Sequence, residues 1–66
     1  MESKHFQLND LNWVKFDQGG KQVLGAIGGF EFAVIFDSLL MANLFYQRQV
    51  AAMHKLEGAV NAYQRN

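Results

Sequence analysis

The sequence predicts an α+β protein in which a three-stranded antiparallel β-meander over residues 11–36 is followed by one long helix over residues 37–63. Short segments rich in β-branched and aromatic residues alternate with glycine pairs, a pattern typical of β-hairpins. The C-terminal segment instead carries apolar residues at alternating spacings of three and four, which is typical of a helix. The 66 residues make a single small domain, and a chain this short that lacks cysteine is expected to gain stability by self-association, as a dimer or higher oligomer.

Three strands are predicted, over residues 12–16, 21–27 and 30–36. The first two are joined by a four-residue loop, Asp-Gln-Gly-Gly at positions 17–20, and the last two by the Gly28-Gly29 pair. Glycine suits both places because tight hairpin turns need backbone conformations with positive φ. These turns set the register between the strands.

The predicted cross-strand pairs are Ile27 with Phe30, Gly25 with Phe32, Val23 with Val34, Lys21 with Phe36, and Phe16 with Lys21. This register makes one face of the sheet apolar, and that face is expected to take the helix. The other face would still carry Trp13, Leu24 and Ile35. One helix cannot cover both faces, so a second copy or a target protein is expected on the second face.

The predicted helix carries one stripe in which seven of eight positions are apolar or aromatic: Leu39, Ala42, Tyr46, Gln49, Met53, Leu56, Val60 and Tyr63. Asp37 or Ser38 can cap its first turn. Residues 39–46 are apolar in almost all directions, so the first two turns are expected to be enclosed by protein. The helix would be roughly 40 Å long, against a diameter of roughly 28 Å for a compact chain of this size. Either other copies pack along the overhang or the helix breaks near Gly58.

The first ten residues are polar apart from Phe6 and Leu8, and are expected to form a tail or a short edge element. The stretch MESKHFQLND lacks the apolar segment of a secretory signal, which favours a cytoplasmic location.

No catalytic, cofactor-binding or metal-binding residues are predicted. His5 and His54 have no metal-ligating companion at helical spacing, and Glu31 and Asp37 are too far apart along an extended segment to work as a carboxylate pair. The glycines do not form a phosphate-binding loop, because no Gly-Lys-Ser/Thr follows them. The protein is therefore expected not to be an enzyme.

The predicted function is binding: a small regulatory protein, an inhibitor or adaptor, that contacts itself and another protein through apolar surfaces. The predicted contact residues are Trp13, Leu24, Ile35, Val50, Met53, Leu56, Val60 and Tyr63. Trp13 and Tyr63 are the expected hot spots. The partner's identity and the exact oligomeric state stay open.

Two alternative functions stay open. Residues 23–46 contain only two charges, Glu31 and Asp37, and are long enough to cross a bilayer. A weak nucleic-acid-binding surface could also combine basic and aromatic side chains, namely Lys15, Lys21, Arg48 and Lys55 with Trp13 and Phe16. Against the second, the six basic and six acidic residues balance, so the chain has no overall field to attract a polyanion.

Overall fold

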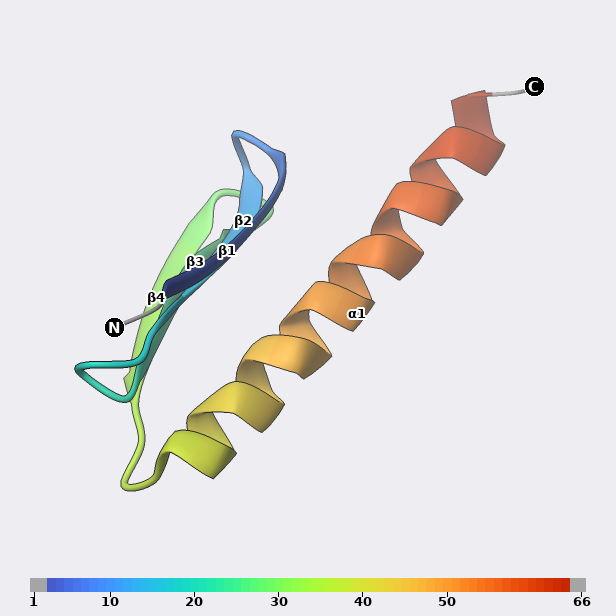
Figure 1. Cartoon of the computed structure of the whole chain (residues 1–66). Helices are drawn as coiled ribbons and strands as arrows, with labels where there is room; N and C mark the ends of the chain where they lie inside the picture. Colours follow the sequence, from blue (N-terminus) through green and yellow to red (C-terminus); the bar gives the residue numbers. More distant parts are fainter. Residues whose placement is uncertain (1–2, 65–66) are drawn as a thin grey trace.

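The computed structural model of the chain describes residues 3–64, and the side chains of residues 3–59. It has two layers, a four-stranded antiparallel sheet in the order β1-β2-β3-β4 and a single helix on one face of it (Figure 1). The elements are β1 Ser3–Asn9, β2 Asn12–Asp17, β3 Gln22–Ile27, β4 Phe30–Ile35 and α1 Leu39–Gln64. The predicted α+β class, with an antiparallel sheet followed by a C-terminal helix, is confirmed.

The predicted number of strands is wrong, because residues 3–9 form a fourth strand at the edge of the sheet, beside β2. Phe6 lies opposite Val14 and packs against the core. The rest of β1 is polar because an edge strand leaves most of its surface in water. Only two apolar residues, Phe6 and Leu8, alternate there, which is too short a pattern to predict a strand.

The predicted register of the last hairpin is confirmed pair by pair, from Ile27 with Phe30 to Val23 with Val34. Gly28 and Gly29 both adopt positive φ, at 60° and 87°, as the two-residue turn requires.

The β2–β3 register differs from the prediction by two residues. Phe16 lies opposite Val23 rather than Lys21, and the loop comprises residues 18–21, closed by a bond from the Lys21 N–H to the Gln18 carbonyl at 3.2 Å. Lys21, and not a glycine, takes the left-handed conformation next to β3, at φ 50°. This register places Phe16 and Val23 together under the helix, where both are fully buried. Because the shift is even, every side chain stays on its predicted face.

The core lies between α1 and the face of the sheet that was predicted to take it. Its fully packed members are Val14, Phe16, Val23, Ala42, Tyr46 and Met53. The rings of Phe16 and Tyr46 lie 5.9 Å apart at its centre. The helix begins at a serine cap, since the Ser38 hydroxyl accepts a hydrogen bond from the Met41 N–H at 3.2 Å.

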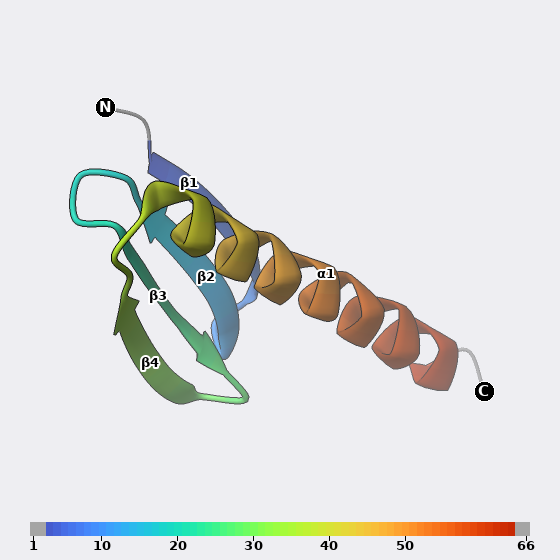
Figure 2. The same ribbon diagram turned by 90° about the horizontal axis from the view of Figure 1, so that it is seen from below.

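The helix runs unbroken through Gly58 to Gln64. It lies over β1, β2 and β3 and continues past the end of the sheet, while β4 lies to one side of it (Figure 2). The molecule is accordingly elongated, measuring 44 × 19 × 17 Å. The first two turns are not enclosed within the chain, contrary to the prediction, because Leu39, Leu40, Met41 and Leu44 are all exposed.

One buried polar residue ties two turns together. The Asn12 side chain donates to Asn9 Oδ1 at 3.1 Å and accepts a bond from the Gly28 N–H at 2.9 Å. The amide thus links the β1–β2 turn to the β3–β4 turn and fixes one end of the sheet.

Candidate interaction surfaces

The open face of the sheet, the face turned away from α1, carries the first group of predicted contact residues. Ile35 is 75% exposed there, whereas Trp13 and Leu24 are half-buried among their neighbours on the sheet. Lys15 and Glu31 lie on the same face and are exposed. The open face is therefore mixed, with an apolar centre and a charged surround, which is the composition of many protein-binding surfaces.

The predicted contact residues on the helix are placed differently. Met53 is a core residue and is buried away from a partner, whereas Val50 packs against that core and is half-buried. Leu56 is exposed. The side chains of Val60 and Tyr63 lie outside the described residues.

β1 contributes to the packing near Met53. Phe6 of this strand packs against the core cluster that contains Met53, and its ring lies 4.8 Å from the ring of His54, the next residue of the helix.

Phe30, the most exposed aromatic side chain among residues 3–59, was not among the predicted contact residues. It is 85% exposed at the start of β4, on the same face of the sheet as α1, and its cross-strand neighbour Ile27 is also exposed. The predicted register paired Phe30 with Ile27 next to the Gly28-Gly29 turn, and the structure has the same pair. Phe30 was missed because the helix was expected to cover that whole face.

The flank of the helix that faces β4 forms an apolar hollow. Its volume is about 120 Å³, and it is lined by Phe36, Met41, Leu44, Phe45 and Arg48. The wall on the sheet side is firmly packed, because the Phe45 ring lies 5.3 Å from that of Phe36 and 6.1 Å from that of Phe32. Met41, on the opposite wall, is 55% exposed. This hollow is the second candidate surface.

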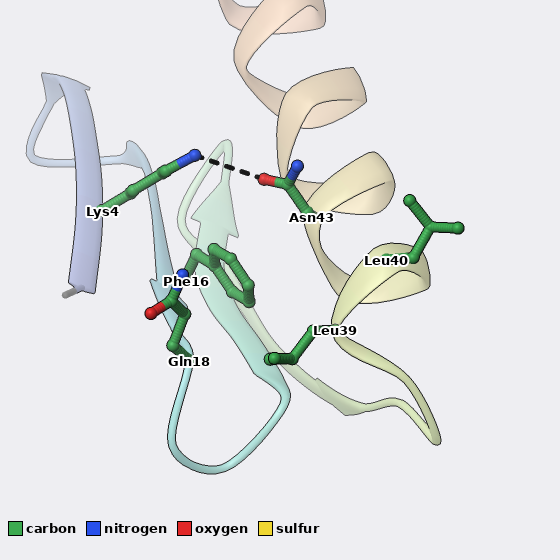
Figure 3. A pocket seen from close by; sticks show the side chains of 6 residues that line it. All are labelled: Lys4, Phe16, Gln18, Leu39, Leu40 and Asn43. Atoms are coloured by element: carbon green, nitrogen blue, oxygen red, sulfur yellow. Dashed lines mark hydrogen bonds between the residues drawn. The ribbon is translucent and has the colours of Figure 1, made fainter. Parts of the chain in front are cut away.

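A larger and more polar pocket lies where the start of the helix meets the β2–β3 loop (Figure 3). Its volume is about 230 Å³, and Lys4, Gln18 and Asn43 bring polar atoms to it above Phe16, Leu39 and Leu40. Lys4 Nζ donates to Asn43 Oδ1 at 3.4 Å (Figure 3). One cation and two neutral amides can hold a polar group, but they do not supply the acid and base of a proton-transfer pair.

The titratable and metal-ligating groups show little convergence. Among residues 3–64, no three His, Asp or Glu side chains gather in a way that could hold a metal ion. Burial raises the pKa of the Tyr46 phenol, which lies under the helix against Phe16. That shift belongs to the core and not to an exposed site.

The structure bears on the two alternative functions, nucleic-acid binding and membrane insertion. Phe16, predicted to stack on nucleic-acid bases, is fully buried and cannot do so. Residues 23–46 are divided among β3, β4 and the start of α1. Within the described part of the chain, none of the helical sequence has both the length and the apolar character that crossing a bilayer requires.

A comparison of the chain with protein-family models, with curated proteins and with solved structures finds no match. What these surfaces do must therefore be inferred from their geometry and chemistry.

Proposed function

We propose that this protein is a small, non-enzymatic binding protein, an inhibitor or adaptor, that acts through apolar surfaces and works as a homo-oligomer. The observation that supports this most strongly is the exposure of large apolar side chains on two opposite sides of one small chain. Ile35 is 75% exposed on the open face, and Phe30 is 85% exposed on the helix side. Exposed apolar side chains that gather in a patch are typical of protein contacts, and on the helix side Met41 and Leu44 are exposed as well.

The two sides suit different tasks. The open face is broad and mixed in polarity, and Trp13 is held at its centre between β1 and β3, opposite Gln7 and Ala26. A rigid, half-buried aromatic side chain surrounded by polar groups is a favourable anchor for a partner protein. The helix side is narrower and more apolar, which suits contact with a second copy.

Site-specific photocrosslinking tests the role of the open face. Trp13→p-benzoylphenylalanine places the reactive ketone at the centre of this face, and the same substitution at Lys55, exposed on the outer side of α1, is the control. Irradiation in the cells that make the protein is expected to give a discrete heavier product from position 13 and none from position 55.

The partner identified in that product is then purified and its affinity measured. Trp13→Ala is expected to weaken binding at least about tenfold, which corresponds to about 1.4 kcal/mol, and Lys55→Ala to leave it unchanged. If position 13 gives no more product than position 55, the open face does not bind a protein and the proposal fails.

A further inference from the structure

The outer edge of β4 presents backbone groups that the described chain does not pair. β4 is the last strand of the sheet, and the Phe36 N–H donates to the Lys21 carbonyl at 2.8 Å. In an antiparallel ladder, residues bonded to one neighbour alternate with residues whose N–H and C=O point the other way. Glu31, Ala33 and Ile35 therefore direct their backbone groups away from β3.

The two edges of the sheet differ in how they are protected against pairing. β1 carries Lys4 and His5 and has an irregular register between Gln7 and Asn9, which are features that discourage strand addition. β4, with the sequence FEFAVI, has a regular register, no proline and no lysine. Its only charge is Glu31. An edge of this kind is expected to be paired in the functional protein.

We infer that β4 pairs antiparallel with β4 of a second copy around a two-fold axis at Ala33, and that Phe30 of each copy enters the hollow of the other. This inference rests on the self-association part of the proposed function and specifies where it occurs.

The two-fold symmetry leaves few registers. Directly opposed residues of neighbouring strands share a face, so a symmetric antiparallel pair must be centred on a residue and not between two residues. Centring on Ala33 pairs Ala33 with Ala33 of the second copy and Glu31 with Ile35 of the second copy. The outward-facing backbone N–H and C=O groups of all three residues then form hydrogen bonds. Centring on Phe32 would leave Ile35 opposite Gly29, in the turn.

The same register brings an exposed ring and an apolar hollow together. Around Ala33, Phe30 lies opposite Phe36 of the second copy, on the helix side of the joined sheet. Phe36 lines the hollow of about 120 Å³. A cavity of roughly 150 Å³ accommodates benzene, so this hollow has the scale of one phenyl ring. Symmetry makes the contact reciprocal, and both exposed Phe30 rings are buried at once.

The total surface is larger than that of a compact monomer. The chain exposes 4868 Å². Folded monomers of this mass expose about 4,250 Å² according to the scaling of surface with mass. The excess of about 600 Å² reflects the elongated shape of the single chain, and pairing of two β4 strands would cover part of the exposed surface.

Sedimentation equilibrium tests whether the chain dimerises through the β4 edge. Wild-type protein is expected to have twice the 7.5 kDa mass of the chain. Phe30→Lys and Ala33→Pro are each expected to weaken the dimer about hundredfold or more. Both should fold, since Phe30 is exposed and the Ala33 N–H has no hydrogen-bond partner among residues 3–64. Leu40→Lys, a matched change at an exposed side chain that lines the pocket beside Lys4 and not the hollow, should leave the dimer intact.

A spin label on Ala33→Cys tests the register, because the chain has no native cysteine. Across the axis the two Cα atoms would be about 5.5 Å apart, so strong dipolar broadening is expected, and a label on Lys55→Cys should show none. A dimer without broadening at position 33 would overturn the edge pairing but leave the proposed function standing. A monomer at all concentrations would overturn both the pairing and the homo-oligomer.

Discussion

Gly25→Ala should destabilise the protein more than its size suggests. Gly25 lies in β3 beneath the Phe32 ring, and a Cβ there would come within 2.5 Å of the Trp13 carbonyl oxygen and 2.8 Å of Phe32 Cζ. The ring can rotate away, but the carbonyl belongs to the neighbouring strand. Overpacking costs about 1–3 kcal/mol, and a backbone neighbour favours the upper end of that range. Alanine regains about 0.4–1 kcal/mol by restricting the unfolded chain, which leaves a net loss of about 2 kcal/mol.

Thermal unfolding followed by circular dichroism measures this loss. In a domain of this size, about 2 kcal/mol corresponds to a fall in Tm of roughly 8–16 °C. Gly58→Ala is the matched control, since a Cβ there would meet no described atom within 4 Å outside the backbone of its own helix. It should raise the Tm because alanine stabilises a helix by about 0.8–1 kcal/mol relative to glycine. Both are compared at one protein concentration, because self-association would make the Tm depend on concentration. If Gly25→Ala melted within a degree or two of wild type, the close packing of β2, β3 and Phe32 would be refuted.

Three further changes test the fold by the same measurement. Asn12→Ala should cost about 1–3 kcal/mol, because it leaves the Gly28 N–H without its acceptor, whereas Asn43→Ala removes only an exposed bond of 3.4 Å and should cost less than about 0.5 kcal/mol; equal losses would contradict this. Ser38→Ala should cost about 1 kcal/mol by removing the helix cap, and no loss would show that the cap is dispensable. Burial raises the pKa of Tyr46 above its ordinary value of 10.0, so the unfolded chain releases this proton first and the free energy of unfolding should fall as the pH rises above 10. Tyr46→Phe should lack that part of the fall, and identical profiles would contradict the assignment.

The last hairpin was the most predictable part of the fold, because two kinds of local information agreed there. The Gly28-Gly29 pair defined a two-residue turn. The alternation from Phe30 to Val34 then allowed only one assignment of these side chains to the two faces of the sheet. The β2–β3 loop offered two glycines at positions 19 and 20, but the left-handed residue next to β3 is Lys21. Packing of Phe16 against Val23 decides this register, and packing is not visible in a turn sequence.

The candidate surfaces were only partly predictable. Ile35 follows from strand alternation alone, and the structure places it on the open face as predicted. Met53 was predicted as a contact residue because the helix was expected to extend past its own small domain, but in the structure Met53 is still within reach of the sheet and is buried in the core. Phe30 became visible as a surface residue only when the path of the helix was known, since α1 lies over β1 to β3 and leaves the start of β4, where Phe30 lies, exposed (Figure 2).

Amide hydrogen exchange at β4 tests most directly whether the sheets of two copies join through their β4 strands. The Phe32 N–H lies on the side of β4 that faces β3 and should be protected at any concentration, whereas the Ala33 N–H faces outward. Edge pairing predicts that the Ala33 N–H is also protected, and increasingly so as the protein concentration rises. Exchange of Ala33 at the rate of a free amide at every concentration, with Phe32 still protected, would contradict the edge pairing.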